Sequence, residues 1–380
     1  METNEIIPFA FAEANKDKTK NIIKVIGVGG GGSNAVINMC KEGVHNVRFA
    51  ICNTDSQALA EAKIPMKIQL GSDGLGVGGK PEKGKEAAEA SLDSISSLFE
   101  DDTEMVFIAC GMGGGTGTGA APVIAEIARD MGILTVGVVT KPFEFEREQK
   151  MNQAMKGIDE MRKHVDALVI IPNQRLLQLN EKQLTFQQAF IMVDDVLHRT
   201  VKIVSDMVNK TAVINVDFSD LSTIIKDAGD AHIAIGTGTG DKKVEEAVQQ
   251  VVNSPLLETS IKNAGRLLTY ITLSQDALMT DVNDAMQAIT KACGADAEII
   301  FGANYGPADM KDSITISVIA TCFKEDAQVS AAPSVADEII GSSVGASTGS
   351  SFADFLSGTK TLSTDDSGYS DLEAIFKNRN

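Results

Sequence analysis

The sequence has few aromatic residues and no apolar run long enough to cross a membrane. It contains no tryptophan, its aromatic content is 5%, and no stretch approaches the roughly 20 apolar residues that a membrane-spanning helix requires. Residues 1–20 are mostly polar and lack a basic segment followed by an apolar one. They therefore predict a flexible N-terminal arm rather than a secretory signal, and we expect a cytoplasmic protein.

Cysteine and histidine are also scarce, and basic residues are outnumbered. The five cysteines and four histidines are dispersed without metal-ligand spacing, which predicts buried free thiols and no metal held directly by side chains. The formal net charge of −18 argues against a nucleic-acid partner bound through its phosphates. A single nucleotide remains compatible with this charge, because backbone amides can hold phosphates without basic side chains.

The first half of the chain alternates short apolar runs with amphipathic stretches, as repeated strand–helix units do. The runs are almost continuously apolar, which is typical of parallel strands covered on both faces. They predict strands at Ile22–Gly27, Val47–Cys52, Met66–Leu70, Met105–Cys110, Ile133–Val139 and Val165–Ile171. The amphipathic stretches predict helices at Asn34–Lys41, Pro81–Leu98, Ala121–Met131 and Gln149–Lys163. We expect a doubly wound, mostly parallel α/β domain in residues 21–183.

The remainder predicts a long connecting helix and a smaller α+β domain. Apolar residues three or four apart predict one central helix over residues 184–209. Residues 210–324 predict the second domain, with helices at Leu221–Ala228, Lys243–Val252 and Val282–Cys293 and strands at Ala231–Ile235, Leu267–Thr272, Glu298–Phe301 and Ser313–Thr321. Residues 325–369 have the composition of a disordered linker. Residues 370–380 regain an apolar helical face, which fits either a frayed tail or a docking peptide.

Two glycine-rich junctions between a strand and a helix compete for a phosphate. Gly27–Asn34 satisfies G-x-G-x-x-G, and Asp55 follows about 20 residues later, so this junction alone suggests an NAD(P)-dependent Rossmann oxidoreductase. Gly111–Gly119 has six glycines in nine residues, so its amides can approach an anion closely, and the next helix adds its positive dipole end. A tight turn explains one or two glycines but not this density.

Within the second junction, Gly113–Gly119 (GGGTGTG) is the run by which the chain resembles the tubulin/FtsZ family of self-assembling GTPases. Other family motifs follow in order, namely Val25–Asn34, Asn53–Asp55, Val139–Phe143, Ile171–Asn173, Asn215–Asp220, Ser254–Leu257 and Asn263–Arg266. The resemblance covers residues 21–323 and implies a tubulin-like fold. It also implies that GTP and GDP are bound instead of NAD, with Mg²⁺ accompanying the nucleotide and K⁺ as a further candidate.

The resemblance also implies which residues contact the nucleotide. Those around the phosphates are Gly30, Gly31, Gly32, Ser33, Gly78, Gly79, Gly113, Gly114, Gly115, Thr116, Gly117, Thr118 and Gly119. Those beside the ribose and the rest of the nucleotide are Thr140, Pro142, Glu146 and Lys150. Those at the guanine are Asn34, Asn173, Phe190 and Asp195, where Phe190 stacks and Asp195 accepts hydrogen bonds. Phe190 fits a core aromatic of the long helix equally well.

Two positions depart from the family pattern. Lys150 stands where the family usually has an arginine, and a lysine supplies a point charge without a bidentate fork, although Arg147 could compensate from a neighbouring turn. Glu373, in the tail, stands where proline is common. The resemblance nevertheless implies that residues 370–380 bind membrane tethers and division regulators, so that the protein is recruited to the inner face of the membrane at the division site without inserting into it.

Asp217 and Asp220, together with Asn215, form the catalytic group that the resemblance implies. Carboxylates at i and i+3 can orient a water and a cation for phosphoryl transfer, although such a pair also caps helices. Because their loop follows the long helix, it should emerge far from its own pocket and serve the next subunit of a head-to-tail filament. The function implied is a GTPase filament of the bacterial division ring. A nonhydrolysing GTP-binding scaffold and the oxidoreductase are the alternatives.

Overall fold

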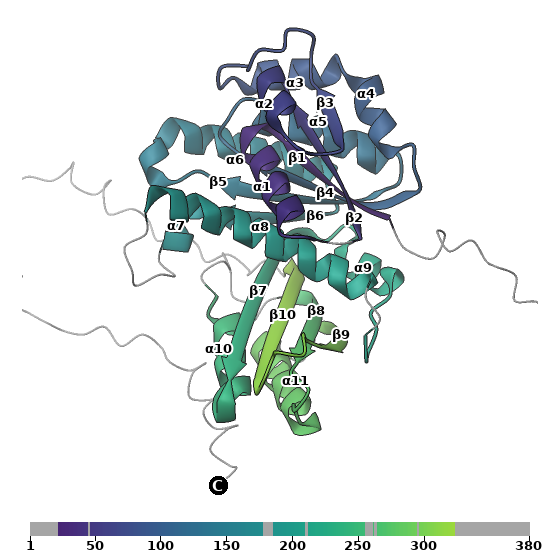
Figure 1. Cartoon of the computed structure of the whole chain (residues 1–380), viewed down its shortest axis with the longest axis vertical. Coiled ribbons are helices and arrows are strands. Elements are labelled where there is room, and N and C mark those ends of the chain that lie inside the picture. The colour runs from purple at the N-terminus through teal and green to yellow at the C-terminus, as the bar shows by residue number, and fades with distance from the viewer. Residues whose placement is uncertain are drawn as a thin grey trace, which may run out of the picture.

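The computed structural model describes residues 22–44, 46–177, 185–209, 212–254, 261, 264–294 and 296–323. The predicted N-terminal arm, linker and docking peptide, and most of the Ser254–Leu257 motif, lie outside these residues. Figure 1 shows the long helix α8 (Phe186–Asn209) crossing the middle of the molecule, with a larger α/β region on one side and a smaller region on the other. The predicted architecture is present, with a doubly wound α/β region, a long helix and a smaller α+β region, whereas the domain limits stay a prediction.

Within the described residues, the sheet has ten strands in the order β3-β2-β1-β4-β5-β6-β7-β10-β8-β9. In the larger region these are β1 (Ile22–Val28), β2 (Val47–Asn53), β3 (Met66–Gln69), β4 (Thr103–Gly111), β5 (Leu134–Lys141) and β6 (Ala167–Pro172). All of their pairings are parallel. The order 3-2-1-4-5-6 reverses between β1 and β4, and doubly wound sheets bind ligands beyond the strand ends at such a reversal.

Helices cover both faces of this part of the sheet and enclose two hydrophobic cores. They are α1 (Gly29–Lys41), α2 (Ser56–Glu61), α3 (Pro81–Glu89), α4 (Leu92–Ser96), α5 (Thr116–Asp130), α6 (Glu148–His164) and α7 (Asn173–Leu176). Two of them, α1 and α5, begin five residues earlier than predicted, because the glycine runs themselves form the first turns. The single helix predicted at residues 81–98 is wrong. It breaks at Ser91, whose hydroxyl donates to Ala87 O and accepts from Gly71 N, each at 2.9 Å.

The smaller region continues the sheet past α8. It contains α9 (Phe218–Ile225), β7 (Gly229–Thr239), α10 (Lys243–Val252), β8 (Ala264–Leu273), α11 (Met279–Cys293), β9 (Glu298–Tyr305) and β10 (Ser313–Phe323). Parallel pairing of β7 with β6 joins the two parts, and antiparallel pairing of β10 with β7 and β8 makes this part mixed, as predicted. A third hydrophobic core fills the space between these strands and α10 and α11.

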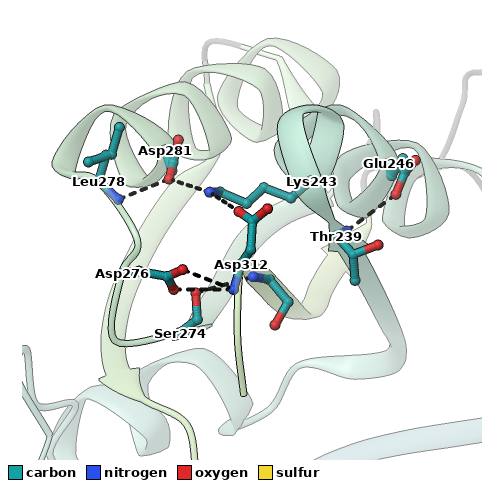
Figure 2. A network of polar contacts seen from close by, with 9 residues as sticks. Thr239, Lys243, Glu246, Ser274, Asp276, Leu278, Asp281 and Asp312 are labelled. Atoms are coloured by element: carbon teal, nitrogen blue, oxygen red, sulfur yellow. Dashed lines mark hydrogen bonds and ion pairs between the residues drawn. The ribbon is translucent and has the colours of Figure 1, made fainter. Parts of the chain in front are cut away.

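A network of polar contacts connects the ends of several helices and strands in the smaller region (Figure 2). Its centre is Lys243, the first residue of α10, whose Nζ lies 3.2 Å from Asp281 Oδ2 and 2.9 Å from Asp312 Oδ1. Asp281 also accepts from Leu278 N at 2.9 Å, and the backbone N of Asp312 donates to both oxygens of Asp276 at 3.2 Å. One lysine therefore connects three chain segments that are far apart in sequence.

The prediction of five buried thiols is correct for three cysteines and wrong for Cys40, and Cys322 is half-buried. Cys52, Cys110 and Cys293 are buried, and burial raises the pKa of each to about 12. Cys40 is exposed, because it points away from the sheet on the outer face of α1. Across the described ranges, no helix combines the length and the apolarity that a membrane span needs.

Candidate nucleotide site

Three glycine-rich loops meet at the edge of the sheet where β1, β3 and β4 end. The α1 loop touches the α5 loop, since a Cβ built on Gly29 would lie 2.8 Å from Gly117 N. The loop after β3 reaches the same place, since a Cβ on Gly115 would lie 2.4 Å from Cγ2 of Val77. Backbone amides from three loops are therefore gathered at the topological reversal, which is the arrangement that holds an anion.

Most of the predicted phosphate glycines fall into two groups. Some are packed against backbone, because a Cβ would lie 2.1 Å from Ala109 O at Gly32, 2.7 Å from Gly111 O at Gly117, and 2.0 Å from Pro81 O at Gly119. At others no described atom lies within 4 Å of the added Cβ, namely Gly30, Gly78, Gly79 and Gly114. The first group allows helices and strands to approach closely, and the second group faces the open space that a ligand would fill.

The two threonines of the glycine run hold its shape. Thr118 Oγ1 accepts from Gly113 N at 2.9 Å, across a turn in which Gly113 has a φ of +97°. Thr116 Oγ1 lies 2.8 Å from Thr54 Oγ1, and both hydroxyls are buried. The predicted hydroxyl contacts to a phosphate would therefore be made in addition to bonds that already stabilise the loop.

Helix α6 contributes a residue that sequence reasoning missed. Gln153 Nε2 donates to Gly114 O at 2.9 Å and to Gly79 O at 3.0 Å, so one amide connects two of the glycine loops. Lys150, one turn earlier, lies beside the same run, since a Cβ on Gly113 would lie 2.8 Å from Lys150 O. Its Nζ forms an ion pair with Glu146 at 2.9 Å, and Glu146 also accepts from Phe143 N at 3.0 Å.

The predicted base side is built by the ends of β5 and β6 and the start of α8. Phe190 packs edge-on against the buried Phe143 with ring centroids 5.3 Å apart, yet 39% of Phe190 is exposed. The ring is therefore both a partner of the core and a surface on which a base could stack. Thr140 and Pro142 are buried at the adjoining strand end.

Two buried polar atoms near this end lack partners. Among the described residues, Asn173 Oδ1 and Ser33 Oγ accept or donate no hydrogen bond, although the two residues are only 5% exposed. Buried polar groups almost always have a partner, and leaving one without costs about 1–3 kcal/mol. A nucleotide with its polar base and phosphates would satisfy such atoms, so the residues present fit the ligand that the resemblance implies.

Helices α1 and α8 run side by side from this pocket. Asn38 Nδ2 donates to Asp194 Oδ2 at 2.6 Å, and one turn further along both helices Glu42 pairs with His198 at 2.5 Å. One turn in the other direction, the same two faces carry Asn34 and Phe190, which are both predicted base contacts.

The two aspartates of α8 have different surroundings. Burial raises the pKa of Asp194 to about 6, above its usual range. Asp195, the predicted guanine acceptor, instead receives a hydrogen bond from Arg199 Nε at 2.8 Å. Its role at the base would therefore need Arg199 to move or to share the carboxylate.

The predicted catalytic loop lies at the other end of α8. Asp217 caps α9 by accepting from Asp220 N at 2.8 Å, and Asp220 accepts from Asp217 N at 3.3 Å. The Oδ1 of Asn215 accepts from Ala212 N at 2.6 Å, which shapes the preceding turn. The helix between Phe190 and Asn209 is about 28 Å long at 1.5 Å per residue, so these carboxylates cannot reach their own pocket.

Two further observations bear on the alternatives. Asp55, which a dinucleotide-binding unit would use for the ribose, caps α2 by accepting from Gln57 N and Ala58 N at 2.9 and 3.2 Å. A cavity of about 1140 Å³ lies between α3, α5 and α6 and includes Gly79, Thr118 and Gly119 in its lining, but it contains none of the predicted base residues. This cavity therefore adjoins the nucleotide site without being the site.

Comparison with known proteins gives concordant matches. A family model described as Tubulin/FtsZ family, GTPase domain, matches residues 22–181, and one described as FtsZ family, C-terminal domain, matches residues 229–324. The cell division protein FtsZ of Aquifex aeolicus (strain VF5) is 46% identical over 308 residues, which are 80% of this chain and 83% of that protein.

Solved structures agree with the sequence matches. The empty FtsZ dimer of M. jannaschii is 36% identical and has a TM-score of 0.74, over 80% of this chain and 89% of that one. CetZ2 from Haloferax volcanii, solved as a GTPγS-bound protofilament, is 18% identical with a TM-score of 0.67, over 81% and 95% of the two chains. That last likeness is one of fold.

Proposed function

The chain belongs to the tubulin/FtsZ family and is a GTPase of the cell-division type, and we propose that it hydrolyses GTP in a pocket completed by the next subunit of a filament. The observation that carries this proposal is the separation of the two halves of the site. The glycine loops lie at one end of α8, and the carboxylates of Asp217 and Asp220 lie at the other. A head-to-tail stack would bring one subunit's carboxylates to its neighbour's pocket.

The exposed apolar side chains support the same assembly. Phe145, Phe186 and Phe190 are 59%, 70% and 39% exposed at the pocket end. Val213 and Ile214, in the catalytic loop, are 62% and 39% exposed at the other end. Apolar groups gathered at both ends of a soluble domain are typical of an association surface, and a stack would cover the two sets together.

In the proposed pocket, the open amides around Gly30, Gly79 and Gly114 would hold the phosphates. Asn34, Asn173 and Phe190 would hold the base. Mg²⁺ bound with the nucleotide would supply charge neutralisation, with K⁺ as a candidate second cation. One oxygen of each carboxylate serves the α9 capping box, so Asp217 and Asp220 each keep one oxygen to orient a water.

The test is phosphate release per subunit against protein concentration, with light scattering recorded in parallel. Asp217→Asn keeps a capping acceptor for Asp220 N but removes the charge, so α9 should remain folded. We expect turnover to rise with filament formation, and we expect Asp217→Asn subunits mixed into wild type to lower turnover more than equal dilution with Asp241→Asn, an exposed control. Turnover that stays flat as filaments form would contradict the shared site.

The same mixing experiment separates the alternatives. A nonhydrolysing scaffold would assemble with GTP and release no phosphate. The proposed tether contact of residues 370–380 is tested apart from hydrolysis, by a chain ending at residue 324. We expect such a chain to keep its turnover and to lose recruitment to the membrane at the division site.

A further inference from the structure

Three potential metal ligands from two helices converge on the side of α8 that faces α1. Glu42 follows α1 as its C-terminal cap, and Asp195 and His198 lie three residues apart on one face of α8. One ligand atom from each of the three lies within 4.8 Å of the other two. Nδ1 of His198 and Oε2 of Glu42 are 2.5 Å apart.

The histidine of this group is buried without hydrogen-bond partners. His198 is 8% exposed, and neither ring nitrogen makes a hydrogen bond of acceptable geometry to any described residue, despite the short approach of Glu42. Burying a polar group in this way is unfavourable unless something binds it. The imidazole is enclosed by the two helices and faces two carboxylates, which is the setting of a metal ligand.

We propose that Glu42, Asp195 and His198 bind a divalent metal ion of the zinc class. Two carboxylates and one imidazole suit Zn²⁺ and its neighbours, whereas Mg²⁺ and Ca²⁺ prefer oxygen ligands throughout. Three protein ligands leave a fourth tetrahedral position for water. The dispersed cysteines and histidines of the sequence gave no sign of this site, because two of its ligands are carboxylates and one lies on a different helix.

The geometry requires only a small adjustment. Ligands about 2.0–2.1 Å from a tetrahedral ion lie roughly 3.4 Å apart, so Glu42 would retreat by about 1 Å from His198. The Glu42 side chain is 53% exposed at the end of its helix and is free to make that movement. The hydrogen bond from Arg199 to Asp195 would orient the ligating carboxylate, as outer partners of metal ligands commonly do.

The binding test uses the nucleotide-free full chain with Cys40→Ser, since an exposed thiol would bind the same metals. Zn²⁺ is titrated in competition with a chromophoric chelator, and Co²⁺ absorption reports the geometry. We expect one ion per chain and a loss of affinity of about 10-fold or more in His198→Gln. The matched control is His164→Gln, whose ring nitrogens lie 3.9 and 3.7 Å from Glu126 and Glu160, and it should bind as the parent does.

A parent chain that binds no Zn²⁺ at micromolar concentrations, or a His198→Gln chain that binds equally well, overturns the metal site. Thermal unfolding checks the fold of each variant. If His198→Gln is unfolded, Glu42→Gln replaces it, because its side chain is exposed and its loss leaves the helix contacts intact.

Discussion

The Nε2 of Gln153 donates a hydrogen bond to the carbonyl oxygen of Gly114 at 2.9 Å. The same amide donates to Gly79 O at 3.0 Å, on the loop whose Gly78 and Gly79 the family resemblance places around the phosphates. Both glycines face open space, so Gln153 holds two exposed segments of the proposed phosphate cradle at a fixed separation. The side chain that donates both hydrogen bonds belongs to α6, a helix that carries no glycine-rich motif.

We therefore expect Gln153→Ala to loosen the cradle. Loss of two hydrogen bonds should raise the dissociation constant of GTP by about 10-fold, equivalent to about 1.4 kcal/mol, with little change in global stability. Amide hydrogen exchange should rise in residues 76–80. The control is Gln149→Ala, an exposed glutamine on the same helix. Equal GTP affinity in the two variants would contradict a positioning role for Gln153.

The sequence alone was sufficient to predict the structural features that depend on a few neighbouring residues. Near-continuous apolar runs predicted the strands, and the density of glycine in 113–119 led to the phosphate cradle that we propose. The spacing of Asp217 and Asp220 already allowed a helix cap, which the structure contains. These features depend on periodicity, turn chemistry and backbone freedom, which act over a few residues.

Features that depend on distant partners could not be predicted. Lys243, Asp281 and Asp312 meet because three strand ends converge, and nothing in their local sequences indicates it. The division of the glycines into packed and open positions has the same origin. Gly32 has no room for a Cβ, because the backbone of β4 lies directly against it. Gly30, two residues earlier, has space for one.

The Lys243 network predicts a stability defect confined to the smaller region. Lys243→Met removes the only charge that both aspartates contact within the described residues, and Lys243 and Asp281 are each 12% exposed at their side chains. We expect the free energy of unfolding to fall by about 2 kcal/mol, less than for a fully buried pair because Asp312 is 55% exposed. Urea denaturation measures the loss, and the exposed neighbour Lys242→Met should show none of it.

Asp194 predicts a pH dependence of stability. Burial raises its folded-state pKa to about 6, above the ordinary aspartate value of 3.8, so folding favours the protonated carboxyl. That contribution is complete below the unfolded pKa and is lost as the pH rises through about 6. Asp194→Asn cannot ionise, so it should be more stable than wild type at about pH 7.5 and nearly equal to it at about pH 4.

Denaturant unfolding of both proteins at the two pH values checks this expectation, because other titrating groups cancel in the difference. The exposed Asp93→Asn serves as the control and should give the same difference at both values. A stability gain for Asp194→Asn that does not change with pH would show that packing, and not ionisation, is responsible.

The two groups of glycines predict opposite outcomes for one substitution. In Gly32→Ala the new methyl would lie 2.1 Å from the carbonyl oxygen of Ala109 on a buried strand, so α1 must move and stability should fall by about 3 kcal/mol or more. In Gly30→Ala the methyl meets no atom within 4 Å beyond its chain neighbours and its own helix backbone, and alanine favours the helix by up to about 1 kcal/mol. Its methyl instead occupies the space proposed for phosphate, so GDP affinity should fall by about 10-fold in a chain that is as stable as wild type. Thermal unfolding and GDP titration of the two variants separate the effects. Normal GDP binding by a stable Gly30→Ala chain would mean that the phosphates do not approach this turn, which would remove the α1 loop from the proposed pocket.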